Sequence, residues 1–145
     1  MAKRPHLEAS LSDVVRSFTM PCGYVIDRER RVVLSTAWDV LTAAEALDHQ
    51  NRLRNDPNFN PDFSQLGDGT RVTKVEATPR DVQMLADRTI FSPGSRRAFV
   101  TKRTAHFGVL RMFQVYRELA GIGEQIKVFH DTESALKWLN EAKTP

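Results

Sequence analysis

The chain of 145 residues has a single cysteine, Cys22, and no long uncharged segment. One thiol forms no disulfide within the chain and builds no zinc site from several cysteines. The longest uncharged stretch, residues 17–26, has ten residues, which is about half of what a membrane-spanning helix needs. The N-terminus is basic, but no apolar segment of the signal-peptide kind follows it. We therefore expect a cytoplasmic protein without a membrane as partner.

Sequence signatures of catalysis and of nucleic-acid binding are also missing. The four histidines, His6, His49, His106 and His130, do not have the spacings of metal ligands. HExxH, GxSxG, Walker A and GxGxxG motifs do not occur. The net charge of +3 is small for a non-specific nucleic-acid binder, and there is no helix-turn-helix, RNP or zinc-finger pattern. The sequence predicts no catalytic residue, metal or cofactor; it argues against nucleic acid as a partner and makes an enzyme the least favoured function.

The composition is that of a folded domain. Hydrophobic residues make up 41% and charged residues 27% of the chain, which is typical of soluble globular proteins and not of disordered ones. No repeat or linker divides residues 20–145, and we expect them to form one domain. In residues 1–19, Leu7, Leu11, Val14 and Phe18 fall at helical spacings. This segment is either a short helical extension or the result of a start assigned too early.

Local signals predict alternating strands and helices. Thr42 begins a T-x-x-E capping box, and Thr78 caps a second helix whose first residue is Pro79. The third strand is expected to end at Gly67. Strands are expected at residues 22–27, 31–37, 63–66, 97–101 and 126–129, and helices at residues 42–56, from 78, at 105–120 and from 132. This order predicts an α/β fold with a mixed, mainly parallel five-stranded sheet and helices packed on it.

Short motifs along the chain occur in the order and at the spacing of a known family. They include Tyr24-Val25-Ile26-Asp27, Leu41-Thr42 with Glu45, Gln65-Leu66 with Asp68, Arg97-Ala98-Phe99-Val100, Phe107-Gly108 with Arg111, and Trp138-Leu139. Over residues 22–139 the chain resembles the SpoIIAA-like branch of the STAS fold (sulfate transporter and anti-sigma-factor antagonist). The resemblance implies a mainly parallel five-stranded sheet but no single chemistry. The chain departs from the pattern at Val40, where the family commonly has a glycine.

The resemblance also implies a regulatory serine at the start of the second helix, which a kinase phosphorylates in true anti-sigma-factor antagonists. Ala77 occupies that position here, and alanine has no hydroxyl group. The neighbouring Thr78 is better placed as the helix N-cap, whose hydroxyl oxygen accepts a backbone N–H. We therefore expect no phosphorylation at this site.

Charge is strongly segregated along the chain. Residues 88–117 contain seven Lys and Arg and no Asp or Glu, which leaves fourteen cations and all eighteen anions elsewhere. The predicted strand 97–101 and the helix after it lie within this window. Ligands of open α/β sheets bind beyond the strand C-termini, where helix N-termini favour anions. One interpretation is a phosphate or carboxylate site formed by Lys102, Arg103, Thr104, Gly108 and Arg111. The other is a solvated positive edge, neutralised by acids of other helices or of a second subunit.

Two classes of function are favoured over an enzyme. The first is a non-enzymatic, STAS-like regulatory module that acts through protein–protein interaction. The second is a carrier or sensor of a small anion at the start of the third helix. The predicted helix 105–120 is apolar on more than one side, because Phe107, Leu110 and Val115 lie off its main stripe. This pattern points to a homodimer or another protein as partner. Cys22 is expected to be a buried, unreactive thiol.

Overall fold

The computed structural model describes residues 22–121 and 123–141, in which five strands form one sheet in the order β1-β2-β3-β4-β5. β1 pairs with β2 antiparallel, and every other neighbouring pair is parallel. The elements follow one another as β1 (Cys22–Asp27), β2 (Val32–Thr42), α3 (Ala43–Arg54), β3 (Ser64–Glu76), α4 (Pro79–Ala86), β4 (Arg96–Val100), α5 (Thr104–Leu119), β5 (Gln125–Phe129) and α6 (Thr132–Glu141). The predicted mixed, mainly parallel α/β sheet is confirmed.

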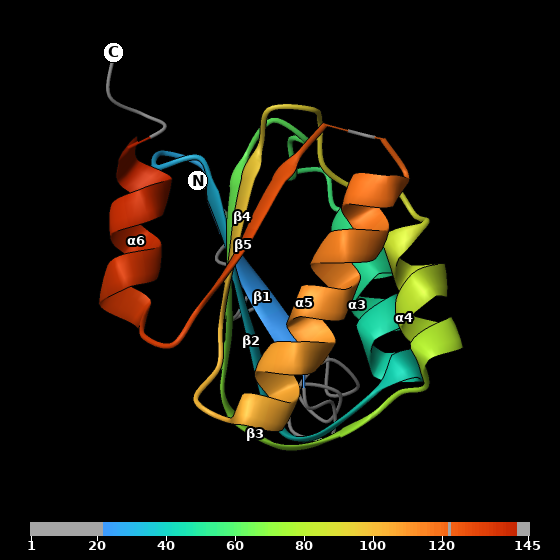
Figure 1. Cartoon of the computed structure of the whole chain (residues 1–145). Helices are drawn as coiled ribbons and strands as arrows, with labels where there is room; N and C mark the ends of the chain where they lie inside the picture. The colour runs from blue at the N-terminus through green and yellow to red at the C-terminus, as the bar shows by residue number, and fades with distance from the viewer. Residues whose placement is uncertain (1–21, 122, 142–145) are drawn as a thin grey trace, which may run out of the picture.

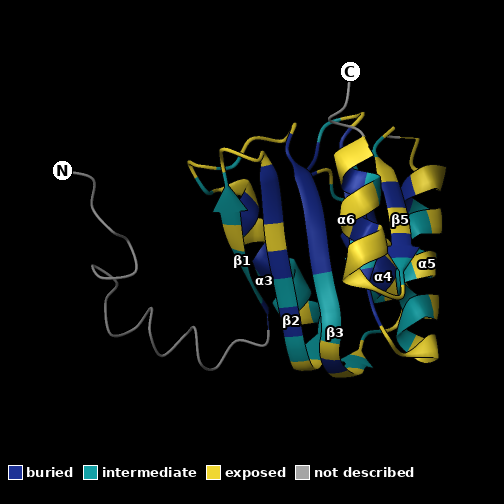
Figure 2. Cartoon of the chain, turned by 90° about the vertical axis from the view of Figure 1, so that its left-hand side faces the viewer, coloured by how far each residue is buried: buried dark blue, intermediate teal, exposed yellow. Residues whose placement is uncertain are grey.

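The helices cover the two faces of the sheet unequally. Among the helices that the structure describes, α3, α4 and α5 lie on one face and α6 lies on the other (Figure 1). α6 contacts β3, β4 and β5. On that side no helix of the described residues covers β1 and β2 (Figure 2), and Val25 and Leu34 are 65% and 37% exposed there. The larger part of the core therefore lies under the three-helix layer, where the candidate site is also found.

The two helix N-caps that the sequence predicts are present in the structure. Thr42 caps α3 and accepts the N–H of Glu45 at 3.2 Å. Thr78 and Asp81 form a complete capping box at α4, in which each side chain accepts the other residue's N–H. The turn between β1 and β2 needs no glycine, because Arg31 itself adopts a left-handed conformation with φ of 58°.

The third strand is longer than its sequence signals predict. β3 runs on to Glu76, so Gly67 does not end it. A Cβ at Gly67 would lie 2.5 Å from Phe99 Cδ1, and one at Gly69 would lie 3.1 Å from the Val100 carbonyl oxygen. These glycines therefore allow β4 and its side chains to lie close to β3, and they are not turn residues. Asp68 marks the last pair between β3 and β4, after which β3 continues against β2 alone.

Two further expectations need correction. Leu119 lies on the stripe of helical spacing that includes Val109, Met112 and Tyr116 and was expected to be buried, but it is 77% exposed, because the last turn of α5 buries Arg117 instead. Trp138, expected in the core because it lies on one helical stripe with Ala135 and Leu139, is only half-buried, whereas those two are the buried residues of α6. The predicted N-terminal helix in residues 1–19 lies outside the described residues. No helix in the described part of the chain is long and apolar enough to cross a membrane.

Candidate functional site

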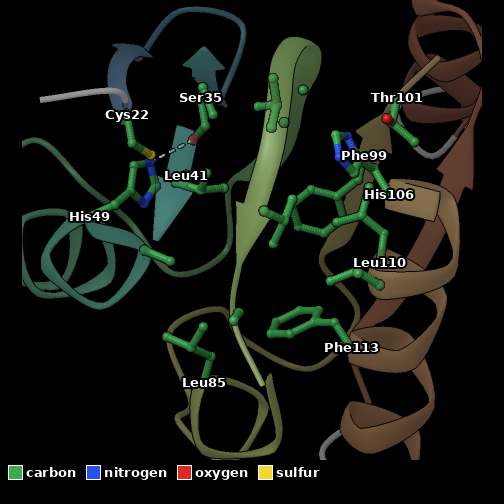
Figure 3. A pocket seen from close by; sticks show the side chains of 18 of the residues that line it. Cys22, Ser35, Leu41, His49, Leu85, Phe99, Thr101, His106, Leu110 and Phe113 are labelled. Atoms are coloured by element: carbon green, nitrogen blue, oxygen red, sulfur yellow. Dashed lines mark hydrogen bonds between the residues drawn. The ribbon is translucent and has the colours of Figure 1, made fainter. Parts of the chain in front are cut away.

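A cavity of about 210 Å³ lies between the sheet and the helices α3, α4 and α5. Its walls are mainly apolar, and Figure 3 shows Leu41, Leu85, Phe99, Leu110 and Phe113 around it. Leu41, Phe99 and Phe113 are only half-buried, so solvent reaches part of the lining. Protein interiors are normally packed without voids larger than a water molecule. A space of this size on the inner face of the sheet therefore marks the candidate site.

A row of hydrogen-bonded side chains crosses the sheet at the wall of this cavity. His49 Nε2 lies 3.0 Å from Ser35 Oγ, which accepts a hydrogen bond from Gln65 Nε2, also at 3.0 Å. Gln65 Oε1 in turn accepts the Nε–H of Arg97 at 2.9 Å. α3, β2, β3 and β4 each supply one of these residues. The row forms one polar wall of the otherwise apolar cavity, and its side chains are hydrogen-bonded to one another.

The electrostatics of this wall do not suit acid–base chemistry. Burial lowers the pKa of His49 to about 4, and the charges of Arg52 and Arg97 act in the same direction. Near neutral pH the imidazole is therefore uncharged and a weak proton acceptor. The nearby thiol of Cys22 also lines the cavity, and burial raises its pKa to about 11. It stays protonated, as expected of a buried, unreactive thiol.

Behind the polar wall lies a buried ion cluster. Arg97 Nη1 donates to Glu124 Oε2 at 2.6 Å, and Arg117 Nη2 pairs with the other oxygen of the same carboxylate. The three side chains are at most 5% exposed. The Arg97 guanidinium also lies over the rings of Phe91, Phe99 and Phe113, at 4.5 to 5.5 Å from their centroids. Aromatic faces and one shared carboxylate thus hold the arginine that faces the cavity.

Two residues of the cavity lining carry a buried polar atom that has no hydrogen-bond partner within residues 22–121 and 123–141. They are Gln50, through Oε1, and His106, through Nδ1. Gln50 is 9% exposed. Burial and the charge of Arg103 lower the pKa of His106, so its ring is a neutral hydrogen-bonding group. An unsatisfied buried polar group is costly to a fold.

The five residues of the predicted anion site lie elsewhere. Lys102, Arg103, Thr104, Gly108 and Arg111 are all exposed, and none lines the cavity. Arg103 is the N-cap residue of α5 and makes no capping hydrogen bond with its side chain. The anion site stays a prediction. The acid-free window is not a uniform solvated edge, because its Arg97 and Arg117 are buried against Glu124.

Around the second helix, Ala77 lines the cavity, and Thr78 is the cap that the sequence predicts. The predicted site residues did not include Ser35, His49, Gln50 or Gln65. The available signal was that these polar residues occur within segments of apolar periodicity. Such positions are buried, and buried polar residues need hydrogen-bond partners. Only the pairing of the strands shows that three of them meet in one row.

No protein-family model and no curated protein matches the chain. Among solved structures, it is similar to the crystal structure of an uncharacterised protein of the DUF3478 family, with a SpoIIAA-like fold, from Shewanella loihica PV-4. The two chains are 18% identical with a TM-score of 0.55, and the similarity covers 81% of this chain and 93% of the other. The resemblance suggested by the short sequence motifs is thereby confirmed at the level of the fold: the chain has a SpoIIAA-like, mixed α/β fold.

Proposed function

We propose that this protein is a non-enzymatic binding module that holds a small, mainly apolar molecule between its sheet and the helices α3, α4 and α5. The observation that carries the proposal is the cavity of about 210 Å³ with its apolar lining. An engineered apolar cavity of about 150 Å³ stays dry and binds benzene. Burial of apolar ligand surface then supplies the binding energy, at roughly 25 cal/mol per Å².

The chemistry of the polar wall supports binding over catalysis. Ser35 and His49 have the separation of a nucleophile and its base, but the lowered pKa of His49 makes it a weak base. Ser35 also accepts a hydrogen bond from Gln65, and this fixes it within the row. These groups orient one another, and the cavity beside them offers space for a ligand.

A cavity-filling substitution tests the proposal. Ala46 on α3 lines the cavity, whereas Ala44 on the same helix is exposed. We expect 4-ethylanisole, a small apolar probe, to raise the melting temperature of the parent protein and of Ala44→Leu, because a ligand of the folded state stabilises it by mass action. In Ala46→Leu the added side chain occupies the space, and the shift disappears. An equal shift in both variants would place the probe outside the cavity.

A second function, interaction with a second copy or another protein, has a separate observation in its favour. Val25 and Leu34 are register partners on the open face of β1 and β2, and both are exposed. Cross-strand neighbours of this kind lie close enough to contact each other. We expect Val25→Lys to lower the mass measured by sedimentation if this surface joins two copies. An unchanged monomer mass in both proteins would exclude the homodimer.

A further inference from the structure

We infer that residues 17–21 of this chain continue β1 along the edge of β2 and place the ring of Phe18 in the cavity, where the ring competes with the ligand. The inference rests on the proposed function and adds the regulation of that site by a segment of the chain itself. Two independent features of the structure support it. One is an unpaired length of strand beside the cavity, and the other is the register in which β1 pairs with β2.

The unpaired strand edge belongs to the second half of β2. The antiparallel pairing of β1 with β2 ends at Cys22 and Ala37, whereas β2 runs on to Thr42. In the part of the chain that the structure describes, residues 38–42 therefore have a strand partner only in β3. An open edge presents unpaired N–H and C=O groups and accepts a further strand. Residues 17–21 immediately precede β1 in the sequence and need no loop to reach this edge.

The register of β1 determines which side chain comes to the cavity. In an antiparallel pair, each step back from Cys22 is one step on from Ala37, so four steps set Phe18 opposite Leu41. Side chains an even number of residues apart lie on the same face of a strand. Cys22 and Leu41 both line the cavity (Figure 3). Phe18 therefore shares the cavity face with Cys22 and lies beside Leu41.

The residues between Phe18 and β1 suit this arrangement. Met20 precedes Pro21, and the residue before a proline prefers an extended backbone. Proline itself is accepted in edge strands. Met20 has the same strand face as Phe18, but its register partner Asp39 is exposed and is not part of the cavity lining. The register thus brings Phe18, and not Met20, to the cavity.

The cavity has room for the ring but not for the ring and a ligand together. Benzene fills an apolar cavity of about 150 Å³, and this cavity has about 210 Å³. Leu41 and Val75 are register partners that pack, half-buried, against the buried cluster of Cys22, Ala37 and Val72. A phenyl ring beside Leu41 covers this apolar floor. Ring and ligand therefore exclude each other.

Substitution of Phe18 in the full chain tests the competition. Phe18→Ser frees the cavity, and calorimetric titration with 4-ethylanisole should give a dissociation constant about tenfold lower than in the parent protein, as for a site occupied in about nine of ten molecules. Leu7→Ser is the matched control, because β2 ends opposite residue 17 and Leu7 lies beyond the pairing; it should bind like the parent. Equal affinity of Phe18→Ser and the parent, or the same gain in Leu7→Ser, would overturn the inference.

Nuclear Overhauser contacts locate the ring directly. The ring protons of Phe18 should contact the methyl groups of Leu41 in the full chain, and saturating 4-ethylanisole should weaken these contacts. Their absence would overturn the inference. Contacts found only between differently labelled copies would assign the ring to a second copy and would overturn it as well. If 4-ethylanisole binds neither the parent nor Phe18→Ser, the proposed function fails, whereas the contacts still decide where Phe18 lies.

Discussion

Removal of the charge of Glu124 should be one of the most destabilising single changes in this protein. The Glu124 side chain is 1% exposed and is the carboxylate that Arg97 and Arg117 share. Glu124→Gln keeps the shape and leaves two arginines buried without an anion. Loss of one partner of a buried ion pair typically costs about 3–5 kcal/mol. This is a large part of the roughly 5–15 kcal/mol by which small proteins are stable.

The other contacts of the two arginines determine where in this range the value falls. Arg97 keeps its hydrogen bond to Gln65, and Arg117 keeps those to the carbonyl oxygens of Ala86 and Arg88. These neutral acceptors solvate the guanidinium groups in part. We therefore expect a loss near the lower end, about 3 kcal/mol.

Urea unfolding followed by circular dichroism measures the difference. Glu118→Gln is the matched control, because Glu118 is exposed on α5 and its side chain accepts a hydrogen bond from Gln114 at 3.1 Å. Its effect should stay within about 0.5 kcal/mol. If Glu124→Gln is unfolded in buffer, refolding with an osmolyte such as TMAO gives the same difference. Equal free energies of unfolding for the two variants would refute the role of the buried cluster.

Three further predictions concern other residues. The folded-state pKa of His49 is about 4, below its usual 6.5, so neutral His49 contributes stability above pH 6.5 that is lost as the pH falls toward 4. Urea unfolding at several pH values should show a smaller loss of unfolding free energy over this interval in His49→Gln, and equal losses would contradict the assignment. Thr78→Ala removes the N-cap of α4 and should cost about 0.5–2 kcal/mol in urea unfolding; no change would mean that the cap is unimportant. If the start of α5 binds anions, phosphate should raise the melting temperature above that in chloride at matched ionic strength, and the shift should shrink in the double variant Lys102→Ala/Arg103→Ala; equal shifts would leave only a general salt effect.

Signals in the sequence predicted the features that depend on nearby residues. The two threonine caps, the hairpin between β1 and β2 and the alternation of strands and helices follow from signals a few residues long. Such signals work because capping and turn hydrogen bonds form within one turn of the backbone. The α/β class and the buried Cys22 were predictable on the same basis.

The tertiary structure alone decided the site. His49, Ser35, Gln65 and Arg97 are separated by 14 to 32 residues along their hydrogen bonds, and they meet because the strand register sets them side by side. The same register makes Gly67 a point of close approach to Phe99, although its sequence context is that of a turn. The cavity exists because three helices pack on one face without filling it. Contacts between distant segments depend on register and packing, and no local pattern in the chain encodes those.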